Sequence, residues 1–288
     1  MKVARIQWNK EYDLNDAVRY IAIRYGLAGE AVLDDQDSLV DWQTLDSYDR
    51  IQKLEVKDYH IELKEYDDTI LRNLNYNVRI APWEKEGITE QVIKNARIGY
   101  FPPTGQITIP HFDIEGRFIG LRGRTLVKED GERYGKYRPL MVGTMQYNHP
   151  LGMNLYNLNH SKDNIKQAGL AICFEGEKSA LLYRSYFGED NDISVACCGS
   201  SISAYQVQFL LDCQAKEIVI AFDRQWEEKN NAEYKHWIKN LEKLHDRFKN
   251  DVTISIIYDR NMITGYKDSP IDDGVETFLK LFKERVRL

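Results

Sequence analysis

The sequence of 288 residues contains no apolar run that approaches the roughly 18 residues of a membrane-spanning helix. Its first stretch, MKVARIQWNKEY, also lacks the apolar segment of a secretory signal. A chain of this length can bury real cores, so a mini-protein held only by disulfides is excluded. Cysteine is scarce, with 4 residues, no CxxC pair and no histidine at zinc-finger spacing. We expect a cytoplasmic protein that does not contact membranes. Its cysteines are expected to be buried thiols: Cys173, Cys197, Cys198 and Cys213.

Proline and glycine, at 7 and 18 residues, are too few for a collagen-like or disordered chain. There is no internal repeat, no low-complexity stretch and no Ser/His/Asp order with a nucleophile elbow. What is present is 43% hydrophobic and 29% charged residues, the composition of an ordinary globular protein. At roughly 150 residues per domain, the length predicts about two domains.

The net charge is −6, but the charges are unevenly distributed. Residues 30–68 carry 13 acids and 4 bases, whereas residues 117–138 carry 7 bases and 3 acids. A negative total ordinarily argues against nucleic acid binding. The distribution matters more than the sum, however, because a local basic segment can still bind phosphates.

The first hundred residues show short helical patterns. A helix is expected over 13–26, followed by an acidic connector of short helices and loops over 30–68. Two further helical patterns, TILRNLNY and TEQVIKNA, lie within 67–98. Thr89 is the expected N-cap of the second one, because its hydroxyl can accept a hydrogen bond from the first turn.

Beyond residue 100 the apolar period changes to two. The segment QITIPHFDIEGRFIGLRGRTL alternates apolar and polar residues and turns at Glu115 and Gly116, which predicts a hairpin. Residues 128–165 are rich in Tyr, Asn, Gly and Pro, and we expect extended strands and loops there.

From Gly169 onward, apolar strands alternate with amphipathic helices in the order LAICFEG, KSALLYRSYFG, ISVACCG, SAYQVQFLLD, EIVIAFD, AEYKHWIKNLEKLHDRF, VTISIIYD and DDGVETFLKLFKERV. Continuous apolar strands separated by helices are typical of a parallel sheet covered on both faces, so a doubly wound α/β domain is expected. We predict a helical, acidic region over 1–70, a mixed α+β subdomain over 71–165 and the α/β domain over 166–288. The last boundary is placed near 161–167.

Acidic residues follow three of the four apolar strands, at the edge where open parallel sheets bind ligands. They are Glu175, Asp223 and Asp259. A further cluster follows the fourth strand: Asp268, Asp272 and Asp273. Carboxylates that converge at one edge repel each other unless a divalent cation neutralises them, and Mg²⁺ is the natural candidate. The alternative is that each acid simply caps the helix that follows it.

In combination, the segments CFEGEKSA, CCGSS, IAFDRQ and KDSPIDD resemble the Toprim domain shared by bacterial and phage DNA primases, topoisomerases and some nucleases. The upstream segments ITIPHFDIEGRFIGLRGRTL and GKYRPL resemble the part that precedes Toprim in primases of the bacterial replicative type. The resemblance covers about residues 99–275. It implies a Toprim-like doubly wound parallel sheet preceded by a mixed α+β primase subdomain.

The resemblance also implies which residues carry catalysis. Glu175 matches the Toprim glutamate, Asp223 the first aspartate of the DxD motif, and Asp268 the acid of the KDP-like motif. These three are the expected catalytic residues.

The expected ligands of Mg²⁺ or Mn²⁺ are Glu175, Asp223, Gln225, Asp268 and Asp272. Gln225 occupies the second DxD position, and Ser179 occupies a position that is often acidic in replicative primases. A neutral amide binds Mg²⁺ more weakly than a carboxylate. Either fewer metals are held, or Glu227 or Asp272 substitutes.

Nucleotidyl transfer, the reaction that the resemblance implies, needs basic residues that bind the phosphates of nucleotide and template. The expected residues are Arg122, Arg124, Lys136, Arg138 and Lys178. Arg122 and Arg124 have the period-two spacing of one strand face, and Lys136 and Arg138 repeat it. The alternative is an ordinary solvent-exposed strand face.

Several residues near these bases have a structural interpretation beside the functional one. Lys178 either reaches a phosphate or pairs with Glu175. Tyr134 and Tyr137 either stack on a template base or pack internally. His111 is expected to be structural, because no nucleophile pairs with it.

We therefore expect a DNA primase catalytic core, a nucleotidyltransferase with DNA-directed RNA polymerase activity that makes short RNA primers on single-stranded DNA. Its expected partners are single-stranded DNA template, ribonucleoside triphosphates and a replicative helicase supplied in trans, because the chain has no GxxxxGK[ST] motif of a fused motor. No zinc is expected, because the cysteines of a zinc ribbon are missing. The chain is then a fragment of a larger primase or a compact phage or mobile-element version.

Two alternatives remain open. One is a Toprim nuclease, which the arginine-rich segment disfavours. The other is a non-catalytic Toprim module that binds nucleic acid, which Gln225 and Ser179 favour.

Overall fold

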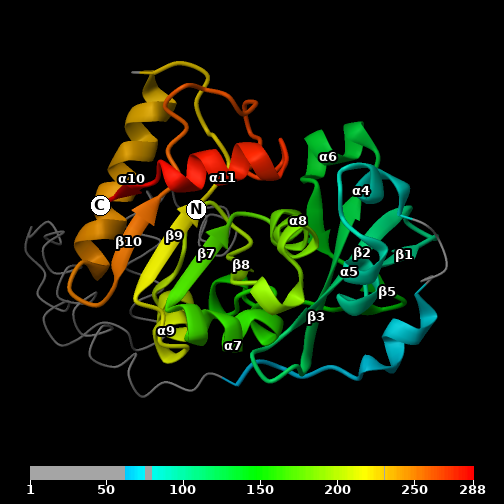
Figure 1. Ribbon diagram of the computed structural model, residues 1–288. Helices are drawn as coiled ribbons and strands as arrows, with labels where there is room; N and C mark the ends of the chain where they lie inside the picture. The colour runs from blue at the N-terminus through cyan, green and yellow to red at the C-terminus, as the bar shows by residue number, and fades with distance from the viewer. Residues whose placement is uncertain (1–61, 75–79, 230) are drawn as a thin grey trace, which may run out of the picture. The chain divides into compact units, whose positions relative to one another are not determined.

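The computed structural model describes residues 62–74, 80–229 and 231–288. The helix expected over 13–26 and most of the acidic connector lie outside these residues. Within them, a four-stranded antiparallel sheet is followed along the chain by a five-stranded, mainly parallel sheet (Figure 1). None of the helices in this described part is long and apolar enough to cross a lipid bilayer.

The second half of the chain forms the five-stranded sheet, in the order β11-β10-β9-β7-β8. Its strands are β7 (Leu170–Phe174), β8 (Ser194–Ala196), β9 (Glu217–Ala221), β10 (Thr253–Ile256) and β11 (Val286–Arg287). The first four run parallel, and β11 pairs antiparallel with β10 at the edge. The helices around this sheet are α7 (Leu158–Ala168), α8 (Glu177–Phe187), α9 (Ala204–Asp212), α10 (Ala232–Phe248) and α11 (Val275–Lys283), with the 3-10 turn η5 (Glu189–Asn191) after α8. The predicted α/β alternation is confirmed.

Both faces of the parallel sheet are buried. In β7, Ile172 and Phe174 belong to a core cluster shared with α8 and α11. Ala171 and Cys173 of the same strand belong to a second cluster, shared with α7, α9 and α10. Because successive side chains of a strand point to opposite faces, one continuous apolar run supplies both clusters.

Helix α9 begins with a reciprocal capping box. Ser203 Oγ accepts a hydrogen bond from the Gln206 backbone N–H at 3.1 Å, and Gln206 Oε1 accepts one from the Ser203 N–H at 2.9 Å. Ser203→Ala removes this cap and is expected to lower the free energy of unfolding by about 1 kcal/mol, measured by urea denaturation. Ser203→Thr keeps a hydroxyl and should stay close to the wild type. An alanine variant as stable as the wild type would contradict the expectation.

The antiparallel sheet has the order β1-β2-β3-β4. Its strands are β1 (Gly99–Phe101), β2 (Gln106–Phe112), β3 (Phe118–Thr125) and β4 (Tyr137–Pro139). The predicted hairpin is β2–β3, and its turn is where the sequence placed it: Gly116 has φ +83°, and Asp113 Oδ1 accepts from the backbone N–H groups of Glu115 and Arg117. A small second hairpin follows: β5 (Met141–Val142) and β6 (Met145–Gln146).

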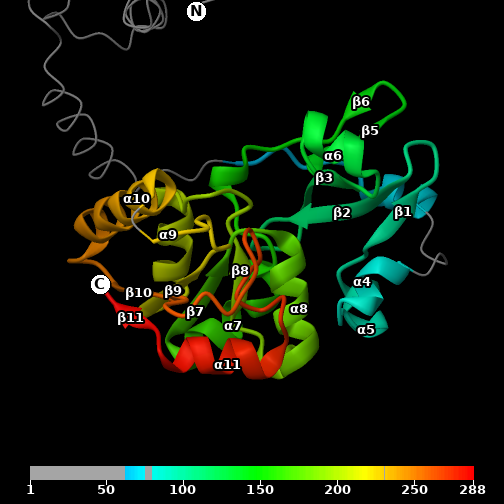
Figure 2. The same cartoon turned by 90° about the horizontal axis from the view of Figure 1, so that it is seen from above.

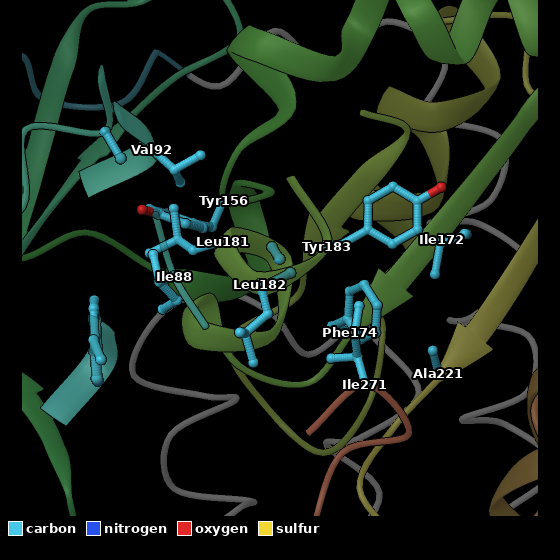
Figure 3. Close-up of a cluster of buried hydrophobic side chains, with 14 of the residues drawn as sticks. Ile88, Val92, Tyr156, Ile172, Phe174, Leu181, Leu182, Tyr183, Ala221 and Ile271 are labelled. Carbon is cyan, nitrogen blue, oxygen red and sulfur yellow. The ribbon is translucent and has the colours of Figure 1, made fainter. Parts of the chain in front are cut away.

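Short helices precede the antiparallel sheet: η3 (Asp68–Asn73), α4 (Ala81–Lys85) and α5 (Glu90–Asn95). Thr89 caps α5 as predicted, because its side chain accepts from the Val92 N–H. Ile88 and Val92 pack in the same core cluster as Leu181 of α8 (Figure 3). In both views α8 therefore lies between α5 and the parallel sheet (Figures 1 and 2).

Two sequence expectations are refined by the structure. The expected helix in TILRNLNY is the 3-10 helix η3 within the described residues. Residues 128–165, expected as strands and loops, also contain η4 (Leu151–Met153), most of α7 and the helix α6 (Lys128–Tyr134). Helix α6 has no buried residue, so it has no apolar periodicity by which the sequence could reveal it.

The expected boundary near 161–167 falls inside the continuous helix α7. The antiparallel sheet ends before this helix, and the parallel sheet begins after it. The division into 71–165 and 166–288 stays a prediction.

Candidate functional site

A pocket of about 250 Å³ is lined by residues that follow β7, β8 and β9 and by residues of β3 and β4. Eight of the ten predicted site residues line it: Glu175, Asp223, Asp268, Asp272, Arg122, Arg124, Lys136 and Lys178. The other two, Gln225 and Arg138, do not. Acidic and basic residues from the two sheets thus share one cavity.

The acidic side of the pocket combines two strand ends and one distant loop. Glu175 directly follows β7, and Asp223 lies just beyond the end of β9. Asp268 is held beside them by two backbone hydrogen bonds between loops. The Arg224 N–H donates to the Asp268 carbonyl at 3.1 Å, and the Lys267 N–H donates to the Arg224 carbonyl at 2.8 Å. The three predicted carboxylates therefore line one pocket.

Two of these acids, Asp223 and Glu175, have raised pKa values. Burial, followed by the negative charges of Glu175 and Asp272, raises the pKa of Asp223 to about 7. Burial also raises the pKa of Glu175. A divalent cation would relieve this repulsion, and carboxylate oxygens are the donors that Mg²⁺ and Mn²⁺ prefer. The residues therefore fit a hard divalent cation.

Two other predicted acidic-edge residues are placed differently. Gln225 Nε2 donates to Glu175 Oε2 at 3.1 Å, so the amide orients Glu175, and its own role as a ligand stays a prediction. Asp259 is buried and does not line the pocket. It accepts from the backbone N–H groups of Ile263 and Thr264 and from the Thr264 hydroxyl. Asp259 thus shapes a loop.

The basic side of the pocket is a layer of arginine and aromatic side chains. Arg122 and Arg124 share one face of β3, and their guanidinium carbons lie 5.4 and 5.8 Å from the ring centre of Tyr137. Arg124 also lies 5.6 Å from the ring centre of the buried Trp83. The side chain of Arg122 is only 12% exposed, so this face of β3 is not a solvent-exposed one. Cation–π contacts of this kind stabilise the positions of both arginines.

Of Lys136 and Arg138, only Lys136 lines the pocket. Strand β4 begins only at Tyr137, so it is Tyr137, paired with Arg124 across the ladder, that faces the pocket. Arg138 instead lies 5.5 Å from the ring centre of the exposed Tyr134. Arg138 therefore lies outside the cavity.

Lys178 does not contact Glu175, and its side chain is not exposed. Its Nζ lies 2.6 Å from Glu86 and 3.0 Å from Asp272. Burial alone would lower the pKa of Lys178, but the carboxylates of Asp272 and Glu86 outweigh it and raise the pKa. Lys178 thus joins the segment of α4 to the acidic edge.

Sequence reasoning missed a buried ion pair behind the arginines. Arg122 Nη1 donates to Glu177 Oε1 at 2.5 Å, and His111 Nε2 lies 3.2 Å from the same oxygen. Burial alone would raise the pKa of Glu177, but Arg122 and His111 lower it to about 2, so the carboxylate is charged. Burial lowers the pKa of His111. The expected structural role of His111 stays a prediction. The only sequence signal for Glu177 was an acid at the first turn of a helix.

Cys198 Sγ completes a group with His111 and Glu177 whose ligand atoms lie within 4.8 Å of one another. Such donors can bind a transition metal. Here, however, the shared Glu177 oxygen already contacts both Arg122 and His111, and a cation would lie beside the guanidinium. We therefore assign this group to ion pairing and not to metal binding.

Lys267 is a further base in the pocket that the sequence analysis did not single out. Within the described residues, Lys267, Lys136 and Arg124 have no carboxylate partner, whereas Arg122 and Lys178 do. Unpaired cations beside a cluster of carboxylates are suited to an anion that arrives together with a metal ion.

Comparisons with known proteins place the chain among relatives. No family model matches it. It is 32% identical over 298 residues to the SPbeta prophage-derived uncharacterized protein YorJ of Bacillus subtilis (strain 168), a match that covers 99% of this chain and 77% of YorJ.

Solved structures of primases have a similar fold. The zinc-binding and RNA polymerase domains of Aquifex aeolicus primase match with a TM-score of 0.57 and 19% identity, over 100% of this chain and 70% of that chain. A DnaG primase catalytic domain bound to single-stranded DNA matches with a TM-score of 0.56 and 15% identity, over 76% of this chain and 77% of that chain. The mixed α/β fold is therefore that of primase catalytic cores. By its sequence, the chain belongs to the family of the SPbeta prophage-derived protein YorJ.

Proposed function

We propose that this chain is a DNA primase catalytic core that synthesises short RNA primers on single-stranded DNA by metal-dependent nucleotidyl transfer. The observation that carries the proposal is the single pocket in which Glu175, Asp223 and Asp268 share the cavity with Arg122 and Arg124. The fold of primase catalytic domains supports it, including one that was solved bound to single-stranded DNA.

In this proposal the carboxylates of Glu175, Asp223, Asp268 and Asp272 hold Mg²⁺ or Mn²⁺. The metal, when bound, lowers the pKa of the attacking 3′-hydroxyl and stabilises the charge that builds on the leaving pyrophosphate. Gln225 keeps Glu175 in place through its amide N–H.

The basic side of the pocket binds the substrate in this proposal. Arg122, Arg124 and Lys136 contact phosphates of the incoming ribonucleoside triphosphate or of the template, because a guanidinium can bind two phosphate oxygens at once. Lys267, which lines the same cavity and has no carboxylate partner among the described residues, adds a fourth cation. Lys178 is already held by Glu86 and Asp272, so we assign it to the acidic edge, where it reaches a phosphate only if one of these pairs opens.

Template DNA, ribonucleoside triphosphates and a helicase supplied in trans remain the proposed partners. No zinc is assigned to the pocket, because its acidic side offers hard oxygen donors. Tyr134 and Arg138 stay candidates for contact with the template outside the cavity, because Tyr134 is 53% exposed.

A primer synthesis assay tests the proposal. The full chain is mixed with single-stranded DNA, ribonucleotides and Mn²⁺ or Mg²⁺, and labelled products are separated by size. Short oligoribonucleotides that need both metal and template support it. Cleavage of DNA without any nucleotide would indicate a nuclease, and binding of DNA without any product would indicate a non-catalytic module. Either result would overturn the primase proposal.

A further inference from the structure

Glu177 is an acid inside the wall of the pocket that the proposed chemistry does not use. It is the first residue of α8, two residues after Glu175, and its side chain is 1% exposed. A buried carboxylate without partners is strongly unfavourable, and the contacts with Arg122 and His111 offset the cost of burying Glu177. The question is whether the ion pair with Arg122 also orients that side chain for a ligand in the pocket.

The contacts of Arg122 leave part of its guanidinium available. Only Nη1 donates to Glu177, and Nη2 makes no hydrogen bond to a described residue. Nε is buried and has no hydrogen-bond partner. The Tyr137 ring lies against one side of the group, at 5.4 Å. A guanidinium has five N–H donors, so Glu177 fixes one corner and leaves others for a ligand in the cavity.

The other side of Glu177 is equally constrained. His111 contacts the same carboxylate oxygen, and the His111 ring lies 4.9 Å from that of His149 and 5.0 Å from that of Tyr156. His149 occupies the space where a side chain of Gly120 would lie, because a Cβ there would come within 2.5 Å of His149 Nδ1. The carboxylate therefore cannot follow Arg122 if that side chain rotates.

Arg124 is a natural comparison within the same strand. It faces the same pocket two residues later, but among the described residues only the rings of Trp83 and Tyr137 restrain it. Arg122 thus has a carboxylate partner, whereas Arg124 has a second aromatic ring, Trp83, instead.

We propose that Glu177 is a positioning residue that holds the Arg122 guanidinium in one orientation for phosphate binding. The identity of the ligand as a phosphate rests on the proposed function. The orientation of Arg122 by Glu177 can be tested without that function. Arg122 is the group that contacts the phosphate, and Glu177 acts only through it.

Side-chain NMR of ¹⁵N-labelled arginine in the full chain tests the geometric part. Rotation of the Arg122 guanidinium should be slow in the wild type and fast in Glu177→Gln, with Arg124 unchanged. Glu189→Gln is the matched control, because Glu189 pairs with the buried Arg184 outside the pocket. If the glutamine variant does not fold, Glu177→Asp, which keeps the charge, provides the same comparison. Equal Arg122 rotation in the wild type and the variant would overturn the inference.

A double-mutant cycle tests the functional part, with ATP and Mg²⁺ as the probe in titration calorimetry. Glu177→Gln should weaken binding by about tenfold in the wild type, the factor of one charged hydrogen bond, and should have no effect in an Arg122→Gln background. The same loss in both backgrounds would show a merely structural role and overturn the inference. Primer synthesis is scored separately. If the chain makes no primers but Glu177→Gln still changes Arg122 rotation and ATP binding, the proposed function is refuted and the positioning role is kept.

Discussion

Replacing Glu175 by glutamine is expected to abolish primer synthesis, with a loss of about 10³-fold or more. Glu175 directly follows β7, lines the pocket with Asp223 and is one of three acids that the proposal assigns to the metal. An amide of the same shape removes a charged ligand and leaves the packing unchanged. Initial rates of primer synthesis at saturating Mn²⁺ measure the effect.

The same variant should not be less stable than the wild type. Gln225 can still donate to the amide oxygen at position 175, and the repulsion between Glu175 and Asp223 disappears. Thermal denaturation in EDTA at pH 8, above the pKa of about 7 of Asp223, should therefore give an unchanged or higher midpoint. Full activity of Glu175→Gln would remove this residue from the metal site. A large drop in stability would mean that its role is structural.

Gly265→Ala is expected to lower primer synthesis by about 10- to 100-fold. A Cβ at this position would overlap Asp268 Oδ2 and lie 2.9 Å from Asp268 Cγ. Because the Asp268 N–H donates to the Gly265 carbonyl in the same turn, the backbone has little room to adjust, and the carboxylate must rotate away. Binding of Mn²⁺, followed by calorimetry, should weaken in parallel with activity.

Gly152→Ala is the matched control for this prediction. A Cβ there meets only Ser203 atoms at 3.5 Å or more, which is ordinary van der Waals contact, and Gly152 does not line the pocket. It should leave Mn²⁺ binding unchanged. If Gly265→Ala binds Mn²⁺ as well as the wild type does, Asp268 is not a ligand.

Local periodicity was sufficient for the elements whose burial is regular. The runs LAICF and EIVIA became β7 and β9 because both faces of each strand are covered, and the alternating segment around Gly116 became the β2–β3 hairpin. Helix α6 was not predicted, because all its side chains are exposed or partly exposed and they form no apolar pattern. A periodic apolar pattern indicates which residues are buried. It indicates secondary structure only where the buried residues follow the period of that structure.

The candidate site was likewise predictable from the sequence in one part and not in the other. The acids at strand ends were predictable, because parallel strands bring their carboxyl ends to one edge of a sheet. The partners of the bases were not predictable. Arg122 pairs with Glu177 55 residues away, and Lys178 pairs with Glu86 92 residues away.

The amino-acid sequence by itself determined the α/β alternation, the hairpin and the positions of Glu175 and Asp223 after their strands, because these follow from local patterns of apolar and polar residues. The tertiary structure alone decided that Glu177 and His111 restrain Arg122, that Lys178 joins Glu86 to Asp272, and that Arg138 lies outside the cavity. The physical reason is that ion pairs between distant segments depend on how the two sheets pack. The residues next to each partner in the sequence do not indicate that packing.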